Sequence, residues 1–486
     1  MSRPNIIMIM TDQHRGDFMG CMGSEIVATP HLDRMAEEGV LFTRAYCNSP
    51  LCVPSRMSML AGTYPSQTQV FENSDYLRSD MPTIAHAMSL GGYDTVLCGR
   101  MHFVGPDQRH GYQKRLVGDI TSSYPGGPST PYGKLTGTAG QGLKSIRNAG
   151  PGTSPVIQYD EQVTQACEQF LNDHQEADRP FFLTVGYYGP HHPYVCPEPY
   201  YDAALAAIES DKDRLIPKDD EMQHSWLESW RKRLKADEIS DEQLKKARAC
   251  YAGLVSLMDQ HVGRVLKAAE AQSRDTIIIY TSDHGDMAGD RGMFWKRNFY
   301  EGAVRVPMIW KEHSGNNAST KRIAKSLRVD VPVSLIDLAP TFSRIGEAPS
   351  LPQAAGEDLC GLLANALNDA YRVRWSARPF YCELATKQDT AIRVVIRGQM
   401  KLVAFHDSRE MLMFDLERDP MERHNVIRDP AYAVFKEELE ALVEQEWDSS
   451  EIVRSINLKQ QEQQFMKTWA EQVGMGKLDL WDYEAE

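Results

Sequence analysis

The segment Cys52-Val53-Pro54-Ser55-Arg56 combines a potential nucleophile with a permanent cation. Pro54 suits the first turn of a helix, so Cys52 is predicted at the amino end of that helix. Backbone N–H groups and the helix dipole favour an anion there, and Arg56 adds a positive charge one turn later. A buried core thiol is the usual fate of a cysteine, but these neighbours favour a site that binds an anionic substrate at residue 52.

Two pairs of polar residues follow predicted strands. Asp12 and Gln13 come directly after the first apolar run of the chain, and Asp283 and His284 follow an apolar, β-branched run. Open α/β sheets bind ligands at the carboxyl ends of their parallel strands. An aspartate after a strand is usually a helix cap, so either pair alone is weak. Together they supply mostly oxygen ligands, which suit Ca²⁺ better than Zn²⁺.

Three further groups of reactive residues also follow predicted strands or lie in loops. Arg100 and His102 form the first group, His191 and His192 the second, and Lys296 the third. A single histidine is more often a satisfied core residue than a catalyst, and a single lysine is usually solvated. Several such groups in equivalent positions favour an active site at one edge of a sheet.

The elements that would position these residues alternate along most of the chain. Short apolar runs predict strands, and a long amphipathic segment predicts a helix over residues 241–269. The alternation predicts an α/β fold in which helices sandwich a large, mostly parallel sheet. The strands are expected at residues 5–10, 95–98, 181–186 and 276–280. The Gly- and Pro-rich residues 124–155 are expected to form either a loop that shapes the site or a surface loop with no role in it.

The pattern changes after residue 377. Short strands expected at residues 391–395, 401–405 and 411–415, followed by a helix over residues 431–447, predict a smaller α+β domain. The remaining residues are mostly polar. The predicted division is a catalytic domain over residues 1–375, a small antiparallel-sheet domain over 376–457 and a C-terminal tail over 458–486.

Composition restricts the partners of the protein. The 486 residues include 53 Lys+Arg and 67 Asp+Glu, and the net charge of −14 argues against nucleic acid or an anionic membrane as partner. The first apolar run is too short for a signal sequence or a membrane span. Nine scattered cysteines do not suggest a disulfide framework, so we expect a cytoplasmic protein.

With these motifs identified, the chain resembles the type I sulfatases of the alkaline phosphatase superfamily. The Cys52 motif continues with Leu60 and Gly62 as in that family, and the other polar groups occur in the family's order. Residues 414–422 resemble the family's closing motif. The resemblance extends over residues 4–426. Residues 99–108 are most similar to the choline-sulfatase-like branch, and the implied fold is that of alkaline phosphatase.

The resemblance implies a specific chemistry at Cys52. In such enzymes a formylglycine-generating enzyme oxidises this cysteine to Cα-formylglycine, whose hydrate is a gem-diol. One hydroxyl attacks sulfur and the alcohol leaves; the other hydroxyl then loses a proton and sulfate is expelled. The resemblance therefore implies a sulfuric ester hydrolase acting on a small-molecule or saccharide sulfate ester.

The resemblance also implies the metal ligands and the residues that contact sulfate. Residue 52 would share Ca²⁺, with Mg²⁺ as second choice, with four further ligands. These are Asp12, Gln13, Asp283 and His284. Arg56 would fix the diol, while Lys296 and Arg100 would bind sulfate oxygens. The family usually has lysine at position 100; arginine keeps the charge but cannot take part in a proton relay.

The leaving group would be handled by histidines. His191 is the expected acid, His102 could share that role, and His192 is its competitor. Asn73 and His192 are expected to contact the substrate. Choline-type enzymes place a tryptophan in a loop where this chain has Tyr124, and cation–π contact with choline depends on such a ring. The resemblance therefore does not identify choline as the alcohol.

Two alternatives and one assembly prediction remain. A phosphonate or phosphate mono- or diester hydrolase would use the same formylglycine site. A non-catalytic binding protein would keep Cys52 unmodified, although competent residues at every expected position argue against it. Because choline-type relatives assemble through their C-terminal segments, we expect a homo-oligomer in which the apolar residues 478–483 pack near the mouth of a neighbour's active site.

Overall fold

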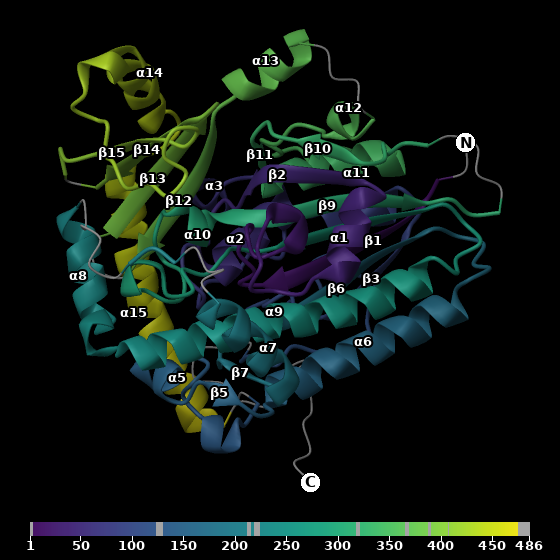
Figure 1. Cartoon of the computed structure of the whole chain (residues 1–486). Coiled ribbons are helices and arrows are strands. Elements are labelled where there is room, and N and C mark those ends of the chain that lie inside the picture. Colours follow the sequence, from purple (N-terminus) through teal and green to yellow (C-terminus); the bar gives the residue numbers. More distant parts are fainter. Residues whose placement is uncertain are drawn as a thin grey trace.

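A computed structural model describes residues 3–122, 130–210, 215–217, 224–316, 321–364, 369–386, 390–406 and 408–474. A large sheet crosses the molecule between two layers of helices, and a smaller sheet lies beside it (Figure 1). Tyr124 and the apolar residues 478–483 lie outside the described residues.

The large sheet has the strand order β10-β2-β9-β8-β1-β6-β3-β4, and β11 pairs with β2. Its centre is parallel, because β1 pairs in parallel with both β6 and β8, whereas β9 is antiparallel to β2 and β8. All residues of β1, β6 and β8 are buried, as a sheet covered on both faces requires. The bounds are β1 (Asn5–Asp12), β2 (Val40–Tyr46), β3 (Asp94–Gly99), β4 (Lys114–Arg115), β6 (Phe181–Pro190), β8 (Thr276–Ser282), β9 (Arg305–His313), β10 (Leu327–Val329) and β11 (Val333–Ser334).

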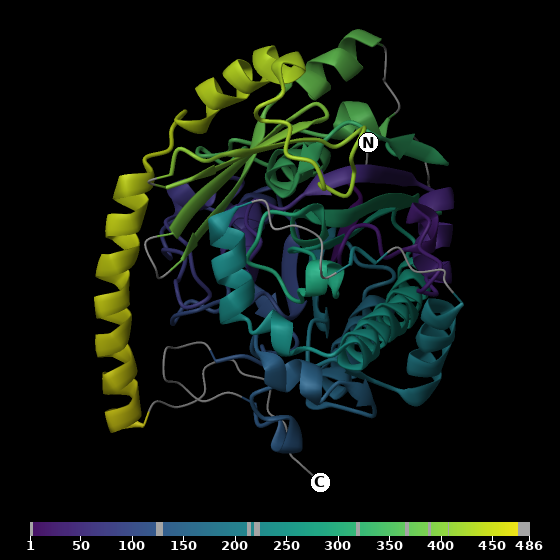
Figure 2. The ribbon, with the colours of Figure 1, turned by 60° about the vertical axis from the view of Figure 1, so that its left-hand side comes forward.

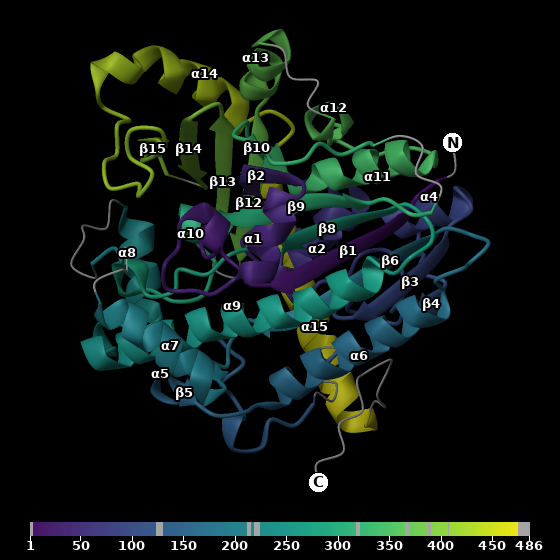
Figure 3. The same ribbon diagram turned by 45° about the vertical axis from the view of Figure 1, so that its right-hand side comes forward.

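Helices cover both faces of this sheet (Figure 3). Alternate residues of β1 point to opposite sides: Ile7 and Ile9 pack with one helix layer, and Ile6 and Met8 with the other. The first layer contains α1 (Pro30–Glu37), α6 (Pro155–Asp173) and α9 (Asp241–Ala269); the second contains α2 (Cys52–Ala61), α4 (Ile84–Leu90) and α11 (Leu338–Gly346). The predicted fold class and the helix over residues 241–269 are therefore confirmed.

The smaller sheet is antiparallel, with the order β12-β13-β14-β15. Its bounds are β12 (Phe380–Thr386), β13 (Thr390–Arg397), β14 (Met400–Phe405) and β15 (Leu412–Asp415). The helix expected over residues 431–447 is shorter, α14 (Ala433–Val443), and packs on β13 and β14.

A long helix, α15 (Ser449–Val473), follows and runs along the outside of the molecule (Figure 2). The Asp448 side chain caps its first turn by accepting from Glu451 N at 3.0 Å. Ile452 and Ile456, one turn apart, are buried beside the small sheet. The predicted boundary between residues 457 and 458 falls inside this helix, and the domain limits stay a prediction.

The remaining elements are short and mostly lie in the connections. They are α3 (Pro65–Thr68), α5 (Leu143–Arg147), β5 (Gly150–Pro151), β7 (Val195–Cys196), α7 (Glu198–Glu209), α8 (Ser225–Arg233), α10 (Glu301–Val304), α12 (Cys360–Leu363) and α13 (Asp369–Ala377). Within the described ranges, no helix combines the length and the apolar character needed to cross a bilayer.

Candidate active site

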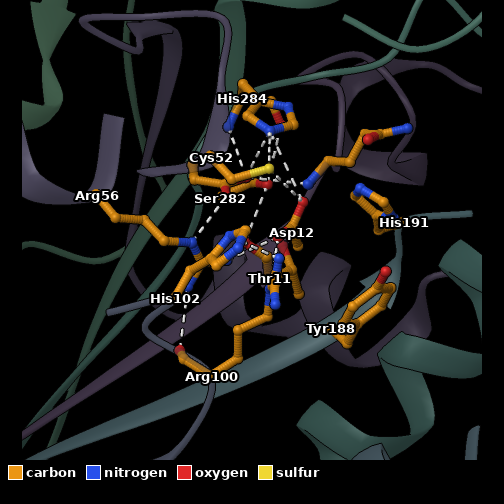
Figure 4. A network of polar contacts seen from close by, with 12 residues as sticks. Thr11, Asp12, Cys52, Arg56, Arg100, His102, Tyr188, His191, Ser282 and His284 are labelled. Carbon is orange, nitrogen blue, oxygen red and sulfur yellow. Dashed lines mark hydrogen bonds and ion pairs between the residues drawn. The ribbon is translucent and has the colours of Figure 1, made fainter. Parts of the chain in front are cut away.

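The functional residues expected from the sequence converge at the carboxyl edge of the large sheet (Figure 4). Asp12 ends β1, and Asp283 directly follows β8. Arg100 comes directly after β3, and His191 directly after β6. Cys52 is the first residue of α2, so its backbone lies at the positive end of that helix, as Pro54 predicted.

Four buried side chains form a cluster with the spacing of a metal site. Asp12, Cys52, Asp283 and His284 each offer one ligand atom, and these atoms lie within 4.8 Å of one another. His284 Nε2 is 3.2 Å from Cys52 Sγ and 3.6 Å from Asp283 Oδ1. Two buried carboxylates facing a histidine nitrogen are suitable ligands for a divalent cation. His284 Nδ1 bonds to Gly285 O at 2.9 Å, which leaves Nε2 directed at the cluster.

Arg56 compensates part of the negative charge of this cluster. Its Nε donates to Asp283 Oδ2 at 2.8 Å, and its Nη2 lies 3.4 Å from Asp12 Oδ2. All three side chains are fully buried. Burial and Cys52 raise the pKa of Asp12, but Arg100, His191 and Arg56 outweigh them and lower it to about 2. The Asp12 carboxylate is therefore ionised and able to bind a cation.

Gln13 connects the cluster to Lys296. Its backbone N donates to Asp283 Oδ1 at 3.0 Å. Its side-chain Nε2 lies 3.2 Å from His192 Nδ1, and its Oε1 accepts from Lys296 Nζ. The amide oxygen therefore faces Lys296, and the expected role of Gln13 as a metal ligand stays a prediction.

Arg100 is held by two carboxylates and an aromatic ring. Its Nε donates to Asp12 Oδ2 at 2.7 Å, its Nη1 donates to Asp119 Oδ1 at 3.1 Å, and its guanidinium lies 4.5 Å from the centre of the Tyr188 ring. The other oxygen of Asp119 accepts from His102 N at 2.8 Å. Sequence reasoning missed Asp119 and Tyr188, because no motif marks either residue.

The two adjacent histidines have different surroundings. His192 is fully buried and its Nδ1 contacts Gln13, whereas His191 stacks on the His192 ring at 3.9 Å and retains 5% exposure. His191 Nδ1 bonds to the carbonyl of His192 at 2.6 Å, which leaves its Nε2 for the site. Burial and Lys296 lower the pKa of His191, against the opposite influence of Asp12 and Cys52.

The surroundings of Cys52 favour negative charge at that position. Burial raises the pKa of the thiol, but Lys296 and His284, together with hydrogen bonds from His102 and His191, lower it well below its usual value. The same groups would stabilise other anionic species there, including a sulfate oxygen. Asn73, expected to contact substrate, accepts from Val53 N at 3.0 Å and so supports the start of α2.

A third residue that sequence reasoning missed is Asp286, at the end of the Ser-Asp-His-Gly-Asp segment. It accepts from Tyr194 Oη at 2.6 Å, from Trp295 N at 2.9 Å and from Gln13 Nε2. It thereby joins the loops that follow β1, β6 and β8, and it fixes the residue before Lys296. The position of Asp286 directly after the Ser-Asp-His-Gly motif could have suggested a role for it. Its hydrogen-bond partners could not be predicted, because they are distant in sequence.

Comparison with known proteins agrees with this site. Residues 4–346 match the family model "Sulfatase", and residues 289–448 match "N-sulphoglucosamine sulphohydrolase, C-terminal". A choline-sulfatase of Rhizobium meliloti is 33% identical over 460 residues, which cover 88% of this chain and 83% of that protein. An arylsulfatase of Clostridium perfringens is 28% identical over 88% of this chain and 91% of its own.

The solved structures share the fold. A phosphonate monoester hydrolase of Agrobacterium radiobacter superimposes with a TM-score of 0.70 at 24% identity, covering 92% of this chain and 96% of its own. The family model covers most of the chain, and the residues typical of the family meet at one buried site. The chain therefore belongs to the sulfatase family, in the alkaline phosphatase superfamily and close to choline-sulfatase, and is a sulfuric ester hydrolase.

Proposed function

We propose that this enzyme cleaves an organic O-sulfate to alcohol and sulfate with residue 52 as Cα-formylglycine. The observation that supports this most strongly is the position of Cys52 at the start of α2, with its Sγ 3.2 Å from His284 Nε2 and 3.6 Å from Asp12 Oδ1. The hydrated aldehyde would supply one hydroxyl to attack sulfur and a second whose ionisation releases sulfate. A formylglycine-generating enzyme would act on the chain during maturation.

We propose that a divalent cation is held by Asp12, Asp283, His284 and residue 52, with Gln13 as a further ligand. The buried carboxylates and the orientation of His284 Nε2 support this assignment. Oxygen-rich ligands favour Ca²⁺, with Mg²⁺ second. Such an ion lowers the pKa of a bound hydroxyl and neutralises anionic oxygens.

The protein's own groups would then act around the sulfate. Arg56 orients residue 52, while Lys296 and Arg100 hold sulfate oxygens. In its protonated form His191 would donate the Nε2 proton to the leaving alcohol, because its Nδ1–H is held by the His192 carbonyl. His102 is the second candidate for this proton. Asn73 and His192 would contact the substrate.

The alcohol is proposed to be that of a small-molecule or saccharide sulfate ester. The choline-sulfatase relative and an N-acetylglucosamine-6-O-sulfatase of Bacteroides thetaiotaomicron at 26% identity support these two classes. We also propose a cytoplasmic enzyme, on the basis of its odd number of scattered cysteines.

We further propose a homo-oligomer. α15 presents an apolar stripe to solvent, formed by Leu458, Phe465, Met466, Trp469 and Val473, with Phe465 74% exposed. The opposite side of α15 packs near the site: Gln463 donates to Asp75 Oδ1 at 2.6 Å, two residues after Asn73. A second copy would cover the stripe, and residues 478–483, beyond this helix, would reach the neighbour's active site.

A phosphonate or phosphate ester hydrolase is the second candidate, and the fold of the Agrobacterium enzyme favours it. The experiment compares p-nitrophenyl sulfate, phenyl phosphonate and phosphate esters on protein co-expressed with a formylglycine-generating enzyme. Peptide mass spectrometry should find the aldehyde at residue 52. A higher kcat/KM for the sulfate supports the proposal, and a higher kcat/KM for the phosphonate favours the second candidate.

The metal assignment has its own test. Asp283→Ala should remove both the bound metal and the activity, and Cys52→Ala should abolish turnover. Metal analysis of the active enzyme identifies the ion. Full activity without a divalent cation, or with an unmodified thiol at residue 52, would contradict the mechanism.

A further inference from the structure

A groove of about 590 Å³ lies outside the active site, between the start of α8, β15 and α14. These elements lie together along one side of the molecule (Figure 1). The lining side chains include four cations, Arg409, Arg423, Arg428 and Lys436, against the carboxylates Glu410 and Glu440. The excess of positive charge is local, because the whole chain carries −14.

Two of these cations are available to a ligand. Arg409 and Arg428 are exposed, and neither forms an ion pair or side-chain hydrogen bond with any described residue. Lys436 is only loosely engaged, since its Nζ lies 3.7 Å from Glu440 Oε1. An exposed arginine that has no ion-pair partner can bind an anion through bidentate hydrogen bonds from its guanidinium group.

A buried histidine adds an independent observation. His224 lines the groove, is 6% exposed, and has no hydrogen-bond partner for Nε2 among the described residues. The nearest carboxylate oxygen, on Glu410, is 3.9 Å away. A buried polar atom without a partner is costly, and a ligand oxygen in the groove would satisfy it.

The groove adjoins the loop between β8 and β9 that carries Lys296. The His224 ring stacks on Phe405 with 3.7 Å between ring centres, and Phe405 contacts Phe299 at 5.7 Å. Phe299 is three residues after Lys296. A neighbouring hollow of about 890 Å³ shares Arg409 but is lined by Glu444 and Asp448. Of the two, the cationic groove is the more favourable for an anionic ligand.

We propose that this groove is a second binding site, which holds sulfated sugar units of an oligosaccharide substrate away from the catalytic centre. A volume of about 590 Å³ exceeds the needs of one inorganic anion and fits a ligand of a few rings. The enzyme already acts on sulfate esters, and a sulfated chain would present further sulfates to Arg409 and Arg428. The proposal rests on the saccharide class of the proposed function.

The test measures binding without turnover. Cys52→Ala protein is titrated with fluorescent, size-fractionated dextran sulfate, and anisotropy is followed at several salt concentrations. Unsulfated dextran of equal length, poly-glutamate and inorganic sulfate are tested in parallel. The change Arg409→Ala with Arg428→Ala should weaken dextran sulfate binding by about fivefold to tenfold, as loss of two exposed charge contacts predicts.

Matched controls separate the groove from general charge effects. Arg147→Ala with Arg179→Ala removes the same charge from two exposed arginines outside the groove and should change binding by less than about twofold. In the otherwise unmodified enzyme, Arg409→Ala with Arg428→Ala should leave p-nitrophenyl sulfate hydrolysis and Tm unchanged, which shows that the site and fold are intact.

Three outcomes would overturn the proposal: unchanged binding in the groove variant, equal weakening in both double variants, or poly-glutamate binding as tight as dextran sulfate. The last would indicate an acidic peptide as the ligand. Because binding is measured on inactive protein, these outcomes are independent of whether residue 52 hydrolyses sulfates.

Discussion

Around residue 52, buried carboxylates are paired with buried arginines of opposite charge. Asp12 and Asp283 face Arg56, and Arg100 adds a second contact to Asp12. Because all of these groups are buried, removing one partner leaves an uncompensated charge in a region with little water. Substitutions of the charged residues therefore mix stability with catalysis. The most informative variants change groups that handle protons or orient neighbours.

His191→Ala should slow the hydrolysis of poor alkyl leaving groups by about 10²- to 10⁴-fold. Activated aryl sulfates should be affected far less, because their alcohols leave without a proton. The dependence of kcat/KM on leaving-group pKa measures the difference. His192→Ala is the control, and any decrease of kcat/KM in this variant should not depend on the leaving group. Equal losses for both substrate types in His191→Ala would point to a binding role, or to His102 as the acid.

Asp286→Asn should impair the orientation of Gln13 and Lys296. The amide keeps one acceptor oxygen but directs an NH₂ group at donors such as Trp295 N. We expect kcat to fall by about tenfold or more, and inhibition by inorganic sulfate to weaken, because Lys296 would be displaced.

Asp290→Asn is the matched control for Asp286→Asn. Asp290 is a buried carboxylate of the same loop, and its Oδ2 accepts from Arg15 Nη1 at 2.9 Å. The Asp290→Asn substitution should lower Tm and should have little effect on inhibition by inorganic sulfate. If both variants lose stability and sulfate inhibition in parallel, Asp286 has only a structural role.

At the scale of elements, the small sheet holds the loop between β8 and β9. Lys401 on β14 is fully buried, with Nζ 3.1 Å from Glu301 Oε1 and 2.7 Å from Glu422 Oε1. Glu422 Oε2 in turn accepts from Glu301 N at 2.7 Å. Burial lowers the pKa of Lys401, but the two carboxylates raise it further than burial lowers it. The closing motif of the family thus contributes a buried ion network rather than a catalytic group.

Lys401→Met should lower the free energy of unfolding by about 3–5 kcal/mol, because two carboxylates would remain buried without their cation. Urea denaturation followed by circular dichroism measures this change. Lys436→Met, at a partly exposed lysine of the same region, is the control and should cost less than about 1 kcal/mol. A loss of less than about 1 kcal/mol in Lys401→Met would show that the network contributes little to stability.

At the scale of the whole molecule, the chain carries a net charge of −14, but the active site and the groove beside α14 each gather several cations. Apolar surface is also concentrated, on the outer side of α15. An exposed stripe of large apolar side chains is costly in water and typical of an interface.

Phe465→Ser with Trp469→Ser should therefore lower the mass of the particle in light scattering. It should also weaken substrate binding more than it slows the chemical step, if residues 478–483 contribute to a neighbouring site. Leu90→Ser, which removes a 77% exposed leucine on α4, is the control and should leave the mass unchanged. An unchanged mass in the double variant would contradict the proposed oligomer.

The sequence by itself determined the family and the fold class, and it predicted the residues that we propose to carry the chemistry. Cys52, Asp12 and Asp283 could be identified because each lies beside a local signal: a helix start or the end of an apolar strand. Parallel strands place such ends at one edge of a sheet, so convergence followed from topology alone. The helix over residues 241–269 was predictable for a similar reason, since its cap and its apolar spacing are local.

Only the tertiary structure decided which groups support these residues. Asp119 and Asp286 bind partners that are distant in sequence or belong to other loops, and no local pattern encodes such pairing. The polar composition after residue 457 suggested a tail, whereas burial of Ile452 and Ile456 against the small sheet stabilises α15. Helix propensity alone is a weak preference, and tertiary packing determines whether such a helix is stable. The cationic groove likewise exists only because α8, β15 and α14 come together.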